Sequence, residues 1–201
     1  MQPFKISDED GETLVKSARR IVTEFVKNKH KVELDEKTGA KFSFESGVFV
    51  TLNVANDLRG CVGFPLPRTL SKALPEAAIA AATGDPRFPP VSADELDGIT
   101  FEVTVLTPPS EINSDDTSKI PSMIKVGRDG LIVRRSFYSG LLLPQVPIEY
   151  GWNETEFLSH TCQKAGLPED SWRDAGTKVF SFEGIIFREE SPNGRVLRHT
   201  L

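Results

Sequence analysis

The residues best suited to chemistry lie in one short segment, Leu58–Gly63, which holds one of the chain's two cysteines beside glycine and close to an arginine. If this segment is a β-strand, its side chains alternate between two faces, so Arg59, Cys61 and Gly63 point one way and the apolar residues point the other. One face is then apolar and the other carries a thiol and a cation. Glycine weakens a strand, so Gly60 and Gly63 predict that a ligand or another backbone comes close.

Cys61 is the candidate catalytic residue, because a thiolate is a strong nucleophile. An unperturbed thiol has a pKa near 8.5, so only about 3% is thiolate at pH 7. A guanidinium roughly 7 Å away would favour the thiolate by about 2.4 kcal/mol at an effective dielectric of 20 but by about 0.6 kcal/mol in water, while burial of the sulfur opposes this. Two interpretations remain open. Either Arg59 activates Cys61 in a half-dry cleft, or Cys61 is a small buried hydrophobe and Arg59 pairs with a carboxylate.

The candidate substrate-binding residues are Arg59, Gly60, Gly63 and Arg87. A guanidinium presents a rigid fork that suits a carboxylate or a phosphate. Arg87 belongs to Asp85–Pro90, a segment with three prolines that must form a stiff loop. If this loop folds back on the strand, Arg87 joins Arg59 in an anion-binding cleft. Alternatively, Arg87 forms a salt bridge with Asp85 or Asp94 that locks the loop.

Other kinds of site find little support. The spacing of the three histidines and two cysteines matches no metal site, and the sequence implies no cofactor. The pattern Gly60-x-x-Gly63 lacks the length and the following Lys-Ser/Thr of a phosphate-binding loop. Phe88, Tyr138 and Trp152 could stack on nucleic-acid bases, but such residues more often anchor cores and loops.

Hydrophobic spacing predicts the elements that position these residues. A capping box of Ser7 and Asp10 starts a helix whose apolar residues recur from Leu14 to Val26. We expect further helices at 70–83, 115–120 and 153–164, and strands at 42–44, 48–54, 58–64, 99–106 and 179–187. A turn at 127–130 predicts a hairpin of 123–126 with 131–135. These patterns favour an α+β fold, a mostly antiparallel sheet flanked by helices, with a smaller α/β lobe at about 86–124.

Composition narrows the class of protein. The chain has 201 residues and a net charge of −5, which argues against a protein built to coat nucleic acid. It has no apolar run of the roughly 18 residues that a membrane span needs, and polar residues follow Met1–Lys5 where a secretory signal would be apolar. We therefore expect a cytoplasmic protein with no membrane partner, in which Cys61 and Cys162 are free thiols.

Four blocks resemble the AMME-syndrome candidate-region protein family, and they come in that family's order across most of the chain. They are Leu58–Gly63, Asp85–Pro90, Glu102–Thr107, and Leu142–Val146 with Trp152. Val62 stands where the family usually has Ile, a difference of one methyl group. The resemblance implies a single AMMECR-like domain over 1–201, with a larger and a smaller lobe and a cleft near 58–63.

The resemblance implies a Memo-like protein and a radical S-adenosylmethionine enzyme as partners, but no established activity. Two hypotheses follow. The chain is an enzyme or an accessory subunit of a modification system, with Cys61 and Arg59 in a cleft for an anionic substrate. Alternatively, it is a non-catalytic interaction or scaffold module. Nucleic-acid binding is a weaker third hypothesis, which predicts a steep salt dependence.

Overall fold

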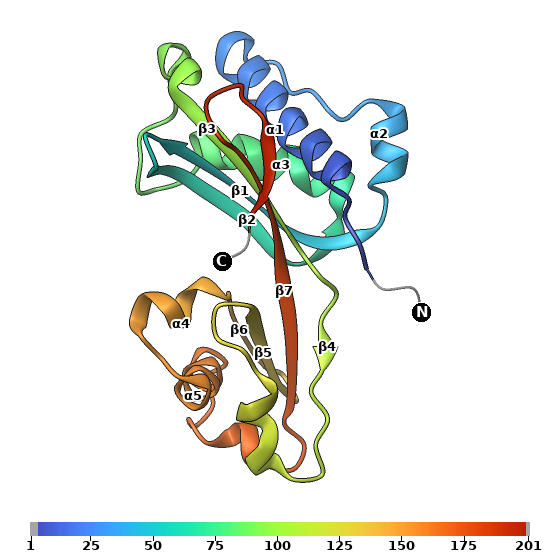
Figure 1. Cartoon of the computed structure of the whole chain (residues 1–201), viewed down its shortest axis with the longest axis vertical. Coiled ribbons are helices and arrows are strands. Elements are labelled where there is room, and N and C mark those ends of the chain that lie inside the picture. The colour runs from blue at the N-terminus through green and yellow to red at the C-terminus, as the bar shows by residue number, and fades with distance from the viewer. Residues whose placement is uncertain (1–3, 200–201) are drawn as a thin grey trace. The chain divides into compact units, whose positions relative to one another are not determined.

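The computed structural model describes residues 4–199 and shows an α+β fold with a mostly antiparallel sheet flanked by helices, as the sequence predicts (Figure 1). The helices are α1 (Asp8–Asn28), α2 (Glu36–Lys41), α3 (Leu70–Thr83), α4 (Gln145–Tyr150) and α5 (Glu154–Lys164), with 3-10 turns η1 (Ala93–Gly98), η2 (Thr117–Met123) and η3 (Ser171–Arg173). The strands are β1 (Glu45–Val54), β2 (Asp57–Thr69), β3 (Ile99–Leu106), β4 (Ser110–Glu111), β5 (Asp129–Arg135), β6 (Tyr138–Leu142), β7 (Lys178–Glu189) and β8 (Val196–His199).

The contacts within the chain divide it into two compact units. Unit 1 comprises the chain up to Leu106 together with the segment from Ile185, and unit 2 comprises Thr107–Gly184. Strand β7 therefore contributes its first half to unit 2 and its second half to unit 1. The expectation of a single domain with a smaller lobe at about 86–124 stays a prediction.

In unit 1 the strands follow the order β2-β1-β3-β7, with β8 paired to β7. Alternate residues of β1 and β3 are fully buried and share one core with α1 and α3, so both helices cover the same face of the sheet. The core residues of these strands include Val48, Val50, Leu52, Phe101, Val103 and Val105. The residues between them point to the opposite face.

Helix α1 shows how the sequence specifies an element from its ends. The predicted capping box is present, with the Ser7 side chain and the Asp10 side chain each accepting a hydrogen bond from the other's backbone N–H. On the buried side, Arg19 forms a two-point ion pair with Glu189 of β7, at 2.6 and 2.5 Å. Glu189 is 2% exposed and also accepts the Phe101 N–H. This pair ties α1 to two strands.

Unit 2 has the strand order β7-β5-β6, with β4 paired to β7. Helix α5 begins at Asn153, whose side chain accepts hydrogen bonds from two backbone N–H groups of the first turn. Its buried face joins the strands in a second core that includes Leu131, Val133, Phe157, Leu158, Trp172 and Val179. Each unit therefore has a core of its own.

Two of the predicted elements need correction, and some of the observed elements were not predicted. Residues 42–44 are not a strand, because Phe42 ends the short helix α2 and is buried in the core. The predicted hairpin is also wrong: β5 pairs with β6, and the turn is Ser136–Phe137, with Ser136 in the left-handed region at φ 54°. Strand β8 was not predicted from the sequence.

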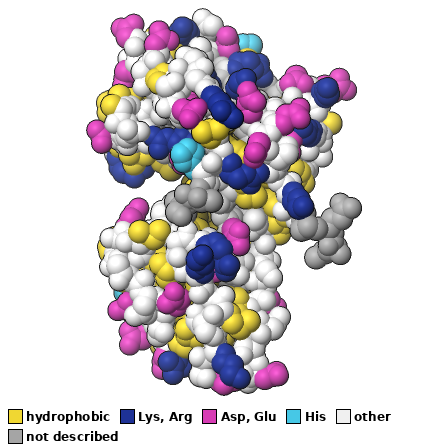
Figure 2. Space-filling view, in the orientation of Figure 1, with side chains coloured by type: hydrophobic (Ala, Val, Ile, Leu, Met, Phe, Trp, Pro, Cys, Tyr) yellow, Lys and Arg dark blue, Asp and Glu magenta, His cyan; other side chains and the backbone are white. Residues whose placement is uncertain are grey.

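The charges on the surface and the apolar character of the helices both bear on the class of protein. Figure 2 shows acidic and basic side chains interspersed on the visible face, with no broad basic patch. No helix within residues 4–199 combines the length and the apolar character that crossing a membrane requires.

Candidate functional site

The segment Leu58–Gly63 forms the middle of β2, but its alternation is interrupted at Arg59. Cys61 lies opposite Thr51 of β1 and Gly60 opposite Leu52, whereas the next residue of β1, Asn53, lies opposite Leu58. Arg59 is the extra residue of a β-bulge, which redirects a side chain. The expected regular alternation therefore holds from Gly60 onwards and fails at Arg59.

Arg59 is engaged with η1. Its guanidinium donates to both Glu95 carboxylate oxygens, at 2.7 and 3.1 Å, and lies 5.9 Å from the centre of the Phe88 ring. This hydrogen bonding lowers the pKa of Glu95 to about 2. The carboxylate partner that the sequence allowed for Arg59 is thus Glu95.

Both glycines lie where another part of the chain comes close, as the sequence predicts. A Cβ on Gly60 would lie 2.2 Å from the Ala81 carbonyl oxygen of α3. A Cβ on Gly63 would lie 2.3 Å from the Val48 carbonyl oxygen and 2.4 Å from the Phe49 ring. The close approach is to the protein itself, so these glycines set the position of β2 against α3 and β1.

Cys61 is half-buried, and it faces away from the core shared with α1 and α3. The Thr51 hydroxyl donates to its sulfur at 3.3 Å. Burial raises the pKa of the Cys61 thiol, against the opposing effects of the Thr51 hydrogen bond and the Arg87 charge. Cys61 is therefore a neutral thiol at pH 7, and the cation that acts on it is Arg87 rather than Arg59.

The proline loop folds back on β2, and an Asp85–Arg87 pair holds it there. The Asp85 carboxylate is 5% exposed and accepts the Cys61 backbone N–H at 2.9 Å. Arg87 donates to Asp85 at 3.0 and 2.7 Å and to the Cys61 carbonyl at 3.5 Å. The Arg87 hydrogen bond holds the pKa of Asp85 well below its usual range. The loop therefore returns to the strand, and Arg87 forms the salt bridge with Asp85 that the sequence offered as the alternative. An anion-binding cleft shared by Arg87 and Arg59 stays a prediction.

Glu102 of β3 is a candidate that sequence reasoning missed. Thr51 lies opposite Cys61 on one side and opposite Glu102 on the other, so these three residues form a row across β2, β1 and β3. We call Cys61, Thr51 and Glu102 the thiol–acid row. Burial raises the pKa of Glu102, although the charges of Arg188 and His199 oppose this. Within residues 4–199, no hydrogen bond or ion pair reaches the Glu102 carboxyl.

The sequence carries only a weak signal for Glu102. It is the single charged residue in the strand Ile99–Leu106, but it shares the less buried face with Thr100 and Thr104. Polar residues at alternate positions are ordinary in an antiparallel strand with one face off the core. Which residue it faces depends on the pairing of three strands, and no local pattern gives that.

Other charged, aromatic and thiol side chains do not belong to the thiol–acid row. Arg68 pairs with Glu76 at 2.9 Å and packs over the Phe64 ring. In unit 2, Trp152 is stacked between Tyr150 and His160, at ring-centre distances of 4.9 and 3.8 Å. Cys162 is fully buried and free. Over the described part of the chain, no cluster of three or more His, Cys, Asp or Glu side chains could hold a metal ion.

Comparison with known proteins agrees with this architecture. Residues 15–187 match the AMMECR1 family model. Protein TK0174 of Thermococcus kodakarensis is 53% identical, over 98% of this chain and 99% of its own length. A protein of Methanothermobacter thermautotrophicus is 50% identical, over 94% of this chain and all of its own length.

One solved structure is also similar over almost the whole of this chain. The crystal structure of the uncharacterized protein PH0010 from Pyrococcus horikoshii has a TM-score of 0.82 and 51% identity, and it covers 98% of this chain and 100% of its own. The family match covers far more than half of the 201 residues, and the relatives match almost from end to end. This chain belongs to the AMMECR1 family.

Proposed function

We propose that this chain is an enzyme, or the accessory subunit of a modification system, that takes an anionic substrate at the thiol–acid row. The observation that carries the proposal is the register of three strands, which puts Thr51 directly between Cys61 and Glu102. Neighbouring strands lie about 4.8 Å apart, so Cys61 and Glu102 are roughly 10 Å apart along the row. In this proposal a small organic anion binds over Thr51, between the two groups.

The charges around the row support an anion. The pKa values of Cys61 and Glu102 are both raised by burial, which favours their neutral forms. The charges that act on these two groups include the guanidiniums of Arg87 and Arg188, and the Asp85 carboxylate opposes Arg87 at Cys61. A neutral acid among cations attracts an anion without repelling it.

Each member of the row has a chemical role in this proposal. A carboxylic acid that keeps its proton donates it to negative charge developing on the substrate, so Glu102 is the general acid. Cys61 is the nucleophile in its thiolate form, with its proton released to solvent water, and the hydrogen bond from the Thr51 hydroxyl at 3.3 Å stabilises the thiolate. Arg87 faces the same strand position from the proline loop and, being 55% exposed, has room for a second anionic partner.

A defined mixture of small organic anions tests the proposal without the substrate having to be identified first. The wild type is incubated with the mixture, and mass spectrometry follows the depletion of each compound. Cys61→Ser and Glu102→Gln are the test variants, and Cys162→Ser is the matched control in unit 2. We expect conversion by the wild type and by the control, and a loss of about 100-fold or more in both test variants. Unchanged conversion by Cys61→Ser contradicts the proposal.

A second candidate function, a non-catalytic interaction module, is favoured by a different observation. Unit 2 exposes several large apolar side chains: Phe137 is 100% exposed, Tyr150 68%, Tyr138 54% and Ile148 52%. Exposed residues of this kind are enriched at protein–protein interfaces. The family resemblance makes a Memo-like protein and a radical S-adenosylmethionine enzyme the partners to try. Loss of their binding in Phe137→Ser, with binding retained in Cys61→Ser, supports the module.

A further inference from the structure

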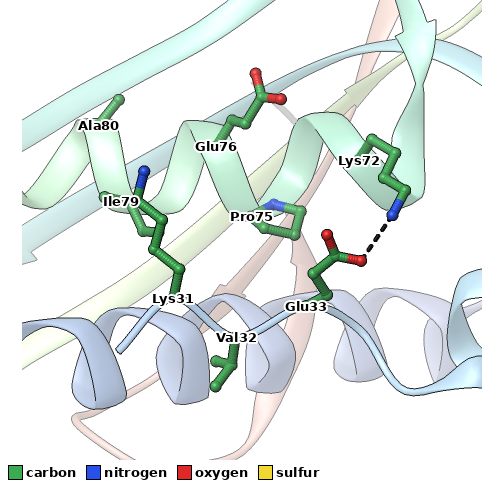
Figure 3. Close-up of a pocket in the computed structure, with 8 residues that line it drawn as sticks. All are labelled: Lys31, Val32, Glu33, Lys72, Pro75, Glu76, Ile79 and Ala80. Atoms are coloured by element: carbon green, nitrogen blue, oxygen red, sulfur yellow. Dashed lines mark hydrogen bonds and ion pairs between the residues drawn. The ribbon is translucent and has the colours of Figure 1, made fainter. Parts of the chain in front are cut away.

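A cavity of about 300 Å³ lies in unit 1 between α3 and the segment that follows α1 (Figure 3). That volume is at the lower end of the range for small-molecule sites. The cavity is lined by residues 31–33 on one side and by one face of α3 on the other. The lining residues are Lys31, Val32, Glu33, Lys72, Pro75, Glu76, Ile79 and Ala80. None of them belongs to the thiol–acid row or to the proline loop.

The cavity has an apolar wall and a charged rim. Pro75 and Ile79 supply the apolar side chains, whereas the side chains of the lining residues Val32 and Ala80 point away from the space between the segment and α3 (Figure 3). Figure 3 shows Lys31 and Glu33 extending from their segment towards α3, and the Pro75 ring facing that segment. A ligand with both an apolar body and a polar group could use both parts.

Among the charged side chains at the rim, one positively charged group has no ion-pair partner in the described chain. Lys72 pairs with Glu33 at 2.6 Å, and Glu76 pairs with Arg68 at 2.9 Å, so both carboxylates at the rim are neutralised. Within the described chain, no hydrogen bond or ion pair reaches the Lys31 ammonium. The balance at the rim is therefore one unpaired cation, which is complementary to a single anionic group.

Pro75 is a second, independent observation. It lies inside α3, where proline removes a backbone hydrogen bond and costs about 3 kcal/mol relative to alanine. The rest of this helix is rich in alanine, the best helix former. A residue that breaks a local rule in this way often marks a functional site, and here its ring forms part of the cavity wall.

We propose that this cavity binds a small organic anion with an apolar body. The anionic group pairs with Lys31, and the apolar body packs against Pro75 and Ile79. The site is separate from the thiol–acid row, and it does not depend on the function proposed above.

The probe is sodium octanoate, an eight-carbon carboxylate, titrated into the full chain by isothermal calorimetry. We expect saturable binding to one site with a Kd of about 1 mM or tighter. 1-Octanol and octylamine have the same apolar body without the negative charge, so both bind more weakly, the amine most weakly. The methyl NMR signals of Ile79 move during the octanoate titration, which locates the site.

Variants test the charge and the volume separately. Lys31→Gln weakens octanoate binding by about fivefold or more, whereas the matched control Lys27→Gln, in the last turn of α1, leaves it unchanged. Ile79→Trp fills the cavity and abolishes binding, and circular dichroism checks that this variant is folded. The proposal is overturned if octanoate shows no saturable binding, if octylamine binds as tightly, or if Lys31→Gln binds octanoate like the wild type.

Discussion

The Asp85 carboxylate accepts the backbone N–H of Cys61 at 2.9 Å, which fixes the proline loop to the strand that carries the thiol. Because Arg87 donates both to Asp85 and to the Cys61 carbonyl, two side chains of one loop satisfy both backbone groups of Cys61. The strand β2 lies at the end of the strand order, so without the loop these groups would lack a strand partner on that side.

Asp85→Asn should therefore loosen the loop. The folded pKa of Asp85 is held low, first by the Arg87 hydrogen bond, so its charge stabilises the fold above the ordinary Asp pKa of about 3.9. We expect a loss of about 2 kcal/mol of unfolding free energy at pH 7. The loss shrinks as the pH falls below about 4, because Asp85 of the unfolded wild-type chain then takes up a proton, and it is gone once the pH is below the folded pKa of Asp85. Urea unfolding at several pH values measures this. Asp94→Asn, in the exposed part of η1, is the control, and a loss at pH 7 equal to that of the control would refute the role of Asp85.

Glu102→Gln should change stability in the opposite sense. Because burial raises the folded pKa of Glu102, ionising it weakens the fold as the pH rises from the ordinary Glu pKa of about 4.3 through the folded value. Glutamine does not ionise. We therefore expect the variant to gain stability relative to the wild type over that range and to keep the gain at higher pH. Thermal unfolding from pH 4 to 8 measures the difference. The control variant Glu45→Gln, at an exposed position of β1, should show no such trend. If the stability difference between Glu102→Gln and the wild type did not change with pH, the Glu102 carboxyl would be solvated.

Gly60→Ala should separate β2 from α3. The added methyl would lie 2.2 Å from the Ala81 carbonyl oxygen, and backbone atoms cannot yield as a flexible side chain can. We expect a loss of about 2–3 kcal/mol. Gly39→Ala in α2 is the matched control, since nothing lies within 4 Å of its added methyl, and it should stabilise by up to about 1 kcal/mol. Equal denaturation midpoints for the two variants would be incompatible with this packing.

Glu189→Gln should show how firmly α1 is held. Arg19 is 12% exposed and Glu189 2%, so removing the negative charge leaves a buried guanidinium without its ion-pair partner. Breaking a buried pair in this way costs about 3 kcal/mol. Glu190→Gln, one residue further and exposed, is the control. Chemical denaturation measures both, and a change below about 0.5 kcal/mol in Glu189→Gln would mean that the pair contributes little.

How far the sequence predicts this protein depends on whether a feature is local. The cap of α1, the helix at 70–83 and the strands at 48–54 and 58–64 follow from local patterns and are confirmed. The bulge at Arg59 and the strand partners of Glu102 depend on register between strands far apart in sequence. The hairpin was misplaced because Gly127–Gly130 resembles a hairpin turn, whereas the chain turns at Ser136–Phe137.

The most direct test of the thiol–acid row is the pH dependence of Cys61 alkylation by iodoacetamide, read from the mass of the Cys61 peptide. In the wild type we expect the rate to reach half its maximum above the ordinary thiol pKa of about 8.5. The Glu102 charge raises the pKa of the Cys61 thiol, so Glu102→Gln should lower the midpoint, whereas Glu45→Gln should leave it unchanged. An identical midpoint in the wild type and Glu102→Gln would contradict the claim that Cys61 and Glu102 form one site.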